Sequence, residues 1–296
     1  MEITEKHKAG FVSLLGNPNV GKSTLMNTLV GEKLSIISAK AQTTRHRIMG
    51  IVNGEDFQIV YSDTPGVLEP NYKMQEYMMQ YVELALQDSD ILLYMVEVGE
   101  TKYNENVINT ILQAKTKIVL IINKIDKFSE EQIVVTKQYW ENLLKPNTTC
   151  CISALERTNV LSVVDSVVDL LPYAPPYFDK DELTDRSMRF FVSEIIREKI
   201  LLLYKKEIPY SVEVEVTAYK EQPNFVHIDA MIYVERESQK AIILGHKGLA
   251  IKELGIQARL AIEEFIESKV YLSLSLKVQK NWRNDDSRLK KFGYGN

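Results

Sequence analysis

Short apolar runs alternate with segments of helical spacing over the first 170 residues. FVSLL (residues 11–15) and IVLII (residues 118–122) are continuous apolar runs, as found in strands that are covered on both faces. LMNTLVG, which follows residue 24, has helical spacing and stops at a glycine. Residues 47–63 hold two strand-like runs on either side of Asn53-Gly54, a dipeptide typical of hairpin turns. We therefore predict an α/β domain with a mostly parallel sheet and one antiparallel hairpin strand.

The pattern changes beyond residue 186. Apolar residues three and four apart predict an amphipathic helix that ends at about Lys206. SVEVEVTAY and FVHIDAMIYVE alternate between apolar and polar residues and predict two strands. A short helix, SQKAIIL, then leads to the tetrad GHKG, and a longer helix and a final strand, KVYLSLSLKVQ, follow it. This order predicts a smaller α+β domain.

Prolines and acidic residues interrupt both rhythms in LPYAPPYFDKDELTD, residues 171–185. A chain of 296 residues is also long for one domain, because single cores stop growing near roughly 250–300 residues. We expect a first domain at residues 1–173, a linker at residues 174–186 and a second domain at residues 187–296.

The composition narrows the class of protein. Hydrophobic residues make up 45% and charged residues 26% of the chain, as in ordinary globular proteins. Cys150 and Cys151 are adjacent, so they are expected to be reduced, buried thiols of a cytoplasmic protein. The N-terminal ten residues lack a signal-peptide pattern, and no run approaches the roughly 18 apolar residues of a membrane span. Surface attachment to a membrane stays open, and the four scattered histidines suggest no structural metal.

The run FVSLL leads into GNPNVGKST, which fits the phosphate-binding pattern GxxxxGK[ST] between a strand and a helix. Glycines in such a loop let backbone N–H groups surround a phosphate, and the helix N-terminus adds positive charge. Lys22 can reach the outer phosphates and Ser23 can ligate Mg²⁺. This loop does not choose between ATP and GTP.

Asn123-Lys124-Ile125-Asp126 follows the buried run IVLII and settles the base. Asp126 can accept two hydrogen bonds from N1–H and the 2-amino group of guanine, which adenine lacks. A site built for such bonds rejects the wrong base by roughly 10⁴ to 10⁵. We therefore expect GTP and GDP as ligands.

Three further motifs complete the nucleotide site. Asp63-Thr64-Pro65-Gly66 ends a strand, where Asp63 can hold Mg²⁺ through water and the Gly66 N–H can meet the γ-phosphate. In SAKAQTTRHR either Thr43 or Thr44 is expected to close on Mg²⁺ when GTP binds. SAL, residues 153–155, can contact guanine through its backbone. The predicted nucleotide-binding residues are Gly16, Asn17, Pro18, Asn19, Val20, Gly21, Lys22, Ser23, Thr24, Asp63, Thr64, Pro65, Gly66, Asn123, Lys124, Asp126, Ser153, Ala154 and Leu155.

Gly245-His246-Lys247-Gly248 lies between the last two predicted helices. The element order around it is that of a type II KH domain, in which a GxxG turn lets backbone N–H groups approach the sugar-phosphate chain of single-stranded RNA. Lys247 adds one counter-charge, and Lys252 in the next helix joins the candidate RNA-binding residues. A plain turn between two helices is the alternative reading of a GxxG tetrad.

The motifs GNPNVGKS, QTTR, DTPG, NKID and SAL stand in the order and spacing of translation-factor-related GTPases, and the chain most resembles the Era family of bacterial ribosome-assembly GTPases. The C-terminal stretch KVQKNWRNDDSRLKKFGYGN is also similar to Era proteins, so the resemblance spans nearly the whole chain. It implies that Thr44 is the switch threonine on Mg²⁺ and that Asn19 stands where potassium-stimulated relatives place a K⁺ ligand.

The resemblance further implies that the RNA is the 3′ end of 16S rRNA, that the protein acts in maturation of the 30S subunit, and that part of it lies at the inner face of the cell membrane. We expect a monomer. Lys280, Trp282 and Arg283, with Lys290 and Lys291, are candidates for an extended RNA surface or a membrane contact, and a solvated amphipathic end is the equal alternative.

One position departs from the Ras pattern. Val67 follows DTPG where a water-orienting glutamine often stands, and valine cannot hydrogen-bond water, so intrinsic hydrolysis should be slow. A K⁺ near Asn19, backbone groups of the switch loops or a partner must complete the site. Arg45 is a candidate finger from within the chain, although basic residues in such loops more often face solvent or a partner.

Two other classes of function stay open at this point. A phosphotransferase would use the same phosphate loop, although NKID argues against it. Alternatively, the second domain docks a protein partner instead of RNA.

Overall fold

The computed structural model describes residues 7–38, 40–114 and 116–295. Residues 1–6, part of the segment expected to lack a signal peptide, lie outside the described residues, as do residues 39, 115 and 296. The chain divides into two compact units, the first ending at Asp185 and the second beginning at Arg186, except that Asn71–Tyr77 belongs to the second. Within the described residues no helix is long and apolar enough to cross a membrane.

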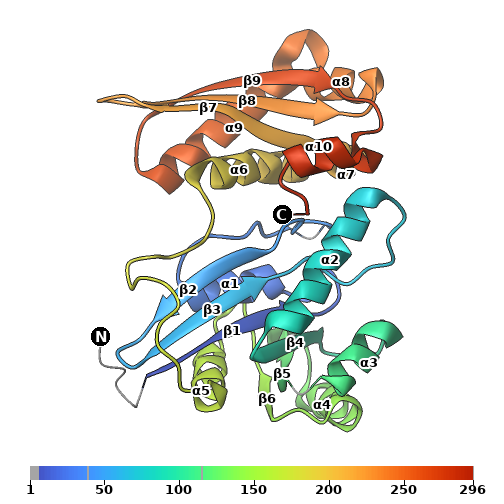
Figure 1. The fold of residues 1–296 in the computed structure, drawn as a ribbon. Coiled ribbons are helices and arrows are strands. Elements are labelled where there is room, and N and C mark those ends of the chain that lie inside the picture. Colours follow the sequence, from blue (N-terminus) through green and yellow to red (C-terminus); the bar gives the residue numbers. More distant parts are fainter. Residues whose placement is uncertain (1–6, 39, 115, 296) are drawn as a thin grey trace. The chain divides into compact units, whose positions relative to one another are not determined.

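The first unit contains a six-stranded sheet in the order β2-β3-β1-β4-β5-β6 (Figure 1). Neighbouring strands are parallel except for β2 and β3, which form the antiparallel hairpin. The predicted fold class is thereby confirmed for this unit. Its elements are β1 (Lys8–Leu15), α1 (Lys22–Val30), β2 (Ile48–Asn53), β3 (Phe57–Asp63), α2 (Lys73–Asp88), β4 (Ile91–Glu97), α3 (Glu105–Gln113), β5 (Lys117–Asn123), the 3₁₀ turn η1 (Ile125–Lys127), α4 (Glu130–Leu144), β6 (Thr148–Cys151) and α5 (Val160–Leu170).

Helices cover both faces of this sheet. Val82 of α2, Ile108 of α3 and Trp140 of α4 share one buried cluster with Leu92 and Leu120 of the central strands. Helices α1 and α5 pack on the strands from the other side (Figure 1). The parallel strands are therefore buried on both faces, and the loops at their carboxyl ends gather at one edge, where open α/β sheets bind ligands.

Residues 174–186 were expected to be a linker. Up to Asp185 they belong to the first unit, and several of them form hydrogen bonds with the hairpin strands. Gln58 accepts hydrogen bonds at its Oε1 from the backbone N–H of Tyr177 at 2.7 Å. The Ile51 N–H donates to the Leu183 carbonyl at 2.8 Å. The chain thus lies along β2 and β3 before it enters the second unit.

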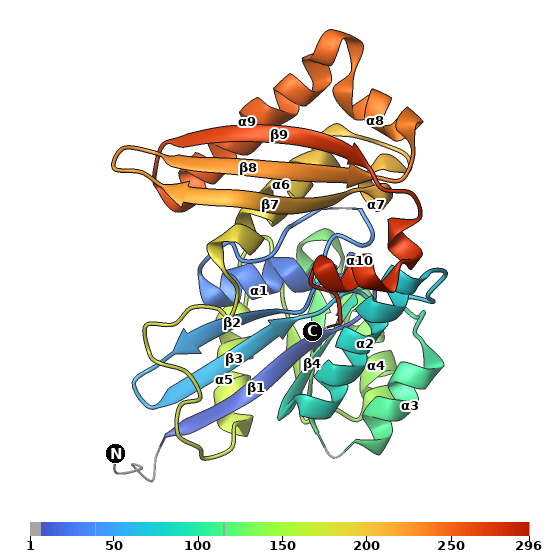
Figure 2. The same ribbon diagram turned by 45° about the horizontal axis from the view of Figure 1, so that its top comes forward.

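The second unit has a three-stranded sheet with β8 in the centre, antiparallel to β7 and parallel to β9 (Figure 2). The predicted order of helices and strands is confirmed, with a short helix before the first strand and another after the last strand in addition. The elements are α6 (Met188–Leu203), α7 (Ile208–Ser211), β7 (Glu213–Glu221), β8 (Val226–Val234), α8 (Glu237–Leu244), the 3₁₀ turn η2 (His246–Gly248), α9 (Leu249–Ile266), β9 (Val270–Val278), the 3₁₀ turn η3 (Trp282–Asn284) and α10 (Asp286–Lys291).

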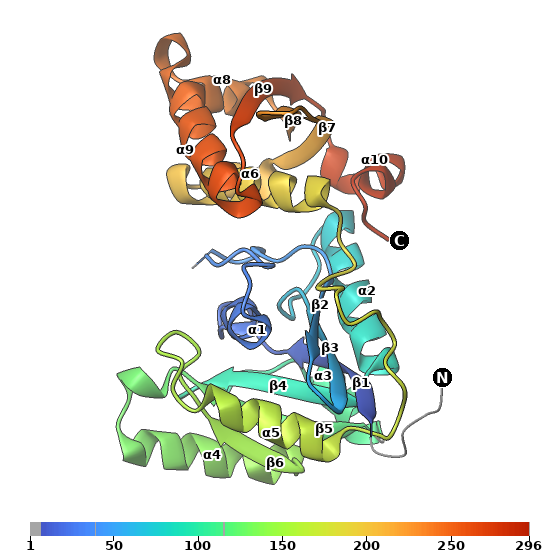
Figure 3. The same ribbon diagram turned by 90° about the vertical axis from the view of Figure 1, so that its left-hand side faces the viewer.

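Helix α6 ends at Leu203, earlier than the predicted end near Lys206. Tyr204 already has an extended backbone, with φ of −107° and ψ of 156°, so the helix stops before Lys206, whose own backbone is left-handed with φ of 55°. Pro209 then lies in the first turn of α7, where its missing N–H costs nothing. Helices α6 and α9 pack on one face of the sheet, where Ile196 and Ile262 are fully buried (Figure 3).

Trp282 lies in the interior of the second unit with none of its surface exposed. Its indole N–H donates to the Ser211 carbonyl at 3.2 Å, and Phe292 packs edge-on at 5.7 Å between ring centroids. Its assignment as a candidate for an RNA surface or membrane contact is therefore wrong, because apolar packing takes up the whole side chain.

The two cysteines are free thiols, as the sequence indicates. Cys150 is buried as predicted, whereas the prediction of a buried Cys151 is wrong, because that residue is half-buried. Burial raises the pKa of the Cys151 thiol, although the nearby Lys137 lowers it.

Candidate functional site

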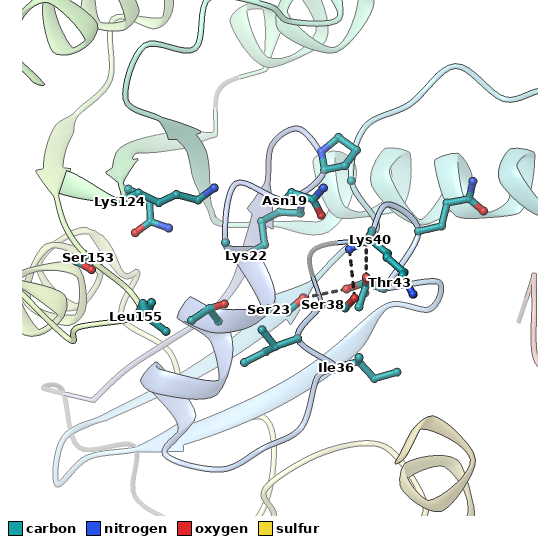
Figure 4. Close-up of a pocket in the computed structure, with 18 of the residues that line it drawn as sticks. Asn19, Lys22, Ser23, Ile36, Ser38, Lys40, Thr43, Lys124, Ser153 and Leu155 are labelled. Carbon is teal, nitrogen blue, oxygen red and sulfur yellow. Dashed lines mark hydrogen bonds between the residues drawn. The ribbon is translucent and has the colours of Figure 1, made fainter. Parts of the chain in front are cut away.

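A pocket of about 390 Å³ opens at the carboxyl edge of the six-stranded sheet (Figure 4). Its volume is within the range of small-molecule sites. Loops after β1, β3, β5 and β6 supply its walls, together with the segment that follows α1. The lining residues are Pro18, Asn19, Gly21, Lys22, Ser23, Thr24, Ile36, Ile37, Ser38, Lys40, Gln42, Thr43, Thr44, Gly66, Asn123, Lys124, Asp126, Lys127, Ser153 and Leu155.

Two glycines allow the phosphate loop to fold tightly against its neighbours. Gly16 has φ of 146°, and a Cβ there would lie 2.2 Å from the Met95 carbonyl oxygen. Gly21 has φ of 108°, and a Cβ there would lie 2.3 Å from Nδ2 of Asn123. Any larger residue would push the loop away from β4 and β5. Helix α1 begins directly afterwards, at Lys22, so its N-terminal N–H groups face the pocket edge.

The Lys22 ammonium is held inside the loop. It donates to the carbonyls of Gly16 and Asn17, at 2.9 Å each. Burial lowers the pKa of Lys22 to about 8, while the carboxylates of Asp63 and Glu100 raise it. Most copies of the protein therefore carry a charged Lys22 at pH 7. In a phosphate loop, a lysine at this position contacts the outer phosphates of the nucleotide.

The side-chain oxygens of Ser23, Thr44 and Asp63 lie close to one another. The Ser23 hydroxyl donates to Oδ2 of Asp63 at 2.7 Å and lies 2.9 Å from the Thr44 hydroxyl. The Thr44 hydroxyl is 3.4 Å from the same carboxylate oxygen. Asp63 is fully buried, and its Oδ1 has no hydrogen-bond partner within the described part of the chain.

Burial raises the pKa of Asp63, against the lowering effect of the Ser23 hydrogen bond and the Lys22 charge. A buried carboxylate with an unused oxygen beside two hydroxyls fits a hard divalent cation that prefers oxygen ligands. Ser23, Thr44 and Asp63 would hold Mg²⁺, which would neutralise charge on the phosphates.

The base side of the pocket is organised by Asn123. Its Nδ2 donates to the Val20 carbonyl at 2.8 Å, and its Oδ1 accepts the Ala154 N–H at 2.9 Å. One buried side chain thus fixes the phosphate loop, the NKID motif and the SAL loop. Asp126 lies in η1 with an exposed side chain, free to meet a base.

The switch segments differ in how they reach the pocket. Thr43 and Thr44 line it, whereas Arg45 is 1% exposed and lies outside its lining, as far as the described residues show. Gly66 also lines it, and a Cβ there would lie 2.8 Å from backbone atoms of Pro18. Val67 turns into the apolar core and donates its N–H to the Gly16 carbonyl at 3.2 Å, so its side chain does not enter the nucleotide site.

Some predicted residues support the pocket from behind its wall. Among the described residues, Gly16, Asn17, Val20, Asp63, Thr64, Pro65 and Ala154 are outside the lining. The Thr64 hydroxyl, for example, donates to the Leu14 carbonyl at 2.6 Å and ties DTPG to β1. The apolar Ile36 and Ile37, which were not predicted, line the pocket. Their position in the sequence, between the phosphate-loop helix and the switch threonines, could have indicated that they line the pocket.

GHKG forms an exposed connection between α8 and α9. Gly245, Lys247 and Gly248 all have positive φ, and His246 and Lys247 are exposed. A Cβ on Gly245 would lie 2.5 Å from that of Ala250, so the turn needs a glycine there. The N-terminal N–H groups of α9 are presented at this turn.

The other RNA-binding candidates differ in their surroundings. Lys252 and Lys280 are exposed. Arg283 instead forms an ion pair with Glu235 and lies over the Tyr72 ring, 4.6 Å from its centroid. Its guanidinium is thus held by contacts within the second unit.

Each half of the chain matches a known protein family. Residues 11–124 match a family described as 50S ribosome-binding GTPase, and residues 207–283 match the KH domain family. GTPase Era from Carboxydothermus hydrogenoformans is 44% identical over 292 residues, which cover 97% of this chain and 98% of that protein.

Two solved structures are similar over 97% of this chain and 99% of theirs, each with 35% identity. One is Era from Aquifex aeolicus, in a variant bound to GDP and aluminium fluoride, with a TM-score of 0.91. The other is Era in complex with MgGDPNP and nucleotides 1506–1542 of 16S ribosomal RNA, with a TM-score of 0.93. With this identity over nearly its full length, the chain belongs to the Era family of GTPases.

Proposed function

We propose that the chain hydrolyses GTP with the help of Mg²⁺ and that its nucleotide state controls the binding of single-stranded RNA. The convergence of Ser23, Thr44 and Asp63 at a pocket that also holds Asp126 carries the first part of this proposal. We assign GTP hydrolysis to residues 1–173 and RNA binding to residues 187–296. Release of phosphate from GTP without an acceptor tests it, and a strict need for an acceptor would favour a phosphotransferase.

Residues of the chain bind and orient GTP more than they activate water. Lys22 meets the outer phosphates, and Asp126 selects guanine. Val67 is buried in the core, so no glutamine-like group stands after DTPG to orient water. Burial of Arg45 also argues against it as a finger. Intrinsic hydrolysis is therefore slow, and switch-loop backbone, K⁺ or a partner must supply the missing stabilisation.

Asn19 is the residue that would hold K⁺. It is exposed at the pocket with a left-handed backbone, φ of 67°, so that it stands at the phosphate loop's outer edge. Turnover in K⁺ should exceed turnover in Na⁺ at equal ionic strength. Equal rates in the two salts would remove the alkali-ion part of the proposal.

The RNA is proposed to be the 3′ end of 16S rRNA, and the process is maturation of the 30S subunit. The support is similarity, at 35% identity over 97% of the chain, to the Era complex with nucleotides 1506–1542 of 16S rRNA. In this chain the exposed GHKG turn offers backbone N–H groups and one lysine to a sugar-phosphate chain.

Binding of a labelled 16S 3′-end oligonucleotide by the full chain tests the assignment. Lys247→Ala should weaken binding and reduce the log-log salt slope by roughly 0.7, because one phosphate contact is lost. Lys220→Ala, which removes an exposed lysine of β7, is the matched control. An unchanged slope for Lys247→Ala would show that this lysine meets no phosphate, and failure of the parent to bind RNA would favour a protein-docking domain.

We further propose a monomer that works in the cytoplasm, with part of the pool on the inner face of the membrane. Lys290 is exposed on α10, although Lys291 already lies 3.1 Å from Glu215. Sedimentation with anionic lipid vesicles tests the membrane contact. Absence of the protein from the vesicle pellet at low salt would leave the cytoplasmic role alone.

A further inference from the structure

The loop between β4 and α3 lies beside the nucleotide pocket, although none of its residues belongs to the five GTPase motifs. It begins after Glu97, which pairs in register with Asn123 of β5. It therefore leaves the sheet at the same edge as NKID. Two carboxylates, Glu97 and Glu100, stand here within hydrogen-bond reach of motif residues.

Glu100 uses both oxygens of its carboxylate. Oε1 accepts a hydrogen bond from Nδ2 of Asn17 in the phosphate loop at 2.6 Å. Oε2 accepts the backbone N–H of Glu97 at 3.0 Å. The Asn17 amide also donates to the Lys102 carbonyl at 2.8 Å, so both of its N–H groups are used on this loop. The Asn17 side chain is thereby anchored, and its backbone carbonyl in turn accepts from Lys22 at 2.9 Å.

A second contact runs from Glu97, the last residue of β4, to the base side of the pocket. The Glu97 carboxylate forms an ion pair with the Lys124 ammonium of NKID. Lys124 has a left-handed backbone with φ of 67° and lines the pocket. Glu100 fixes the backbone of Glu97, and Glu97 fixes Lys124. One carboxylate is therefore connected to the phosphate loop directly and to the base-reading motif through one residue.

Helix α4 holds the loop rigid from the outside. The Gly99 N–H donates to the Thr136 hydroxyl at 2.9 Å, and the Trp140 indole N–H donates to the Glu100 carbonyl at 2.8 Å. Trp140 is fully buried and packs on Tyr94 and Tyr103 at 5.4 and 5.8 Å between ring centroids. The loop is therefore also held by hydrogen bonds to two residues that do not line the pocket.

We infer that Glu100 is a positioning residue of the GTPase site, which sets the phosphate loop through Asn17 and the NKID lysine through Glu97. The inference rests on nucleotide binding by this pocket. A carboxylate is needed because both N–H donors require an acceptor. The amide of a glutamine offers one acceptor only, so its NH₂ group must face either Asn17 or the Glu97 N–H.

Dissociation of N-methylanthraniloyl-GDP from the full chain, chased with unlabelled GDP in Mg²⁺, measures this positioning. Glu100→Gln should dissociate about tenfold faster than the parent, which corresponds to about 1.4 kcal/mol. The thermal midpoint of the nucleotide-free protein should stay within a few degrees. Glu105→Gln, which changes an exposed carboxylate in the first turn of α3, is the control and should dissociate at the parental rate.

Asn17→Ala provides the second test, because it removes the partner and leaves the carboxylate. It should also dissociate several-fold faster, and the double variant Glu100→Gln/Asn17→Ala should be no more than about twofold faster than the faster single variant, because contacting residues are not additive. Rates that multiply across the two changes would overturn the shared contact, as would a parental rate for Glu100→Gln. Failure of the parent to bind GDP would instead refute the proposed function.

Discussion

Replacing Asn123 with alanine is expected to weaken both the fold of the first unit and its grip on nucleotide. The side chain is 3% exposed and makes two hydrogen bonds, to the Val20 carbonyl at 2.8 Å and from the Ala154 N–H at 2.9 Å. Each buried group left without a partner costs about 1–3 kcal/mol. The free energy of unfolding should therefore fall by about 2–6 kcal/mol.

For a domain of this size each kcal/mol lowers the thermal midpoint by about 2–4 °C. Asn123→Ala should thus melt at least about 4 °C below the parent without nucleotide. Without Asn123, GDP must order the pocket loops when it binds. If this costs about 1.4 kcal/mol of binding free energy, the GDP dissociation constant rises at least about tenfold. Circular dichroism melts and titration calorimetry with GDP measure the two effects.

Asn147→Ala is the matched control, since Asn147 accepts the Ile118 N–H at 2.9 Å at the opposite end of β5 but is exposed. Water can replace its bond, so its melting point should change little and its GDP affinity not at all. Equal losses in the two variants, or an unchanged GDP affinity in Asn123→Ala, would refute the assignment of Asn123 as the link between the pocket loops.

Three other changes have defined outcomes. Asp126→Asn should shift the preference from GTP toward XTP, because xanthine has a carbonyl where guanine has an amine; an unchanged preference contradicts the base-reading role. Burial raises the pKa of Asp63. This shift adds to the free energy of unfolding below the ordinary pKa of 3.8, and the addition is lost as the pH rises through the raised pKa. Asp63→Asn should therefore raise the melting point at pH 7 in EDTA and abolish Mg²⁺-dependent turnover, and a lower midpoint speaks against this sign. Trp282→Ala should cost about 3–5 kcal/mol in urea unfolding, more than Trp282→Phe, and equal losses would contradict the packing account.

The strand-end motifs were readable from the sequence because their chemistry fixes residue type and spacing together. A phosphate loop needs glycine where Gly21 stands, and guanine needs a carboxylate where Asp126 stands. The alternation of apolar runs and helical segments likewise gave the order of both sheets' strands along the chain. These signals are local, and each occupies fewer than ten residues.

Contacts between distant segments were not readable in this way. Glu100 meets Asn17 across 83 positions, and Trp282 meets Ser211 across 71. Neither pair repeats a periodicity, so the sequence does not link Glu100 to Asn17 and does not place Trp282 in the interior. The early end of α6 at Leu203 was also not readable, because the apolar spacing continues through Tyr204 although the backbone of that residue is extended.

The burial of Cys150 and the raised pKa of the half-buried Cys151 thiol make the protein well suited to site-specific labelling. Thiolates are the species that react with maleimides, and burial raises the pKa of Cys151 while Cys150 is enclosed. His246→Cys would place an exposed thiol in the GHKG turn, and a fluorophore should attach there while the native pair reacts slowly. Such a probe reports RNA binding at the turn without first removing the native cysteines.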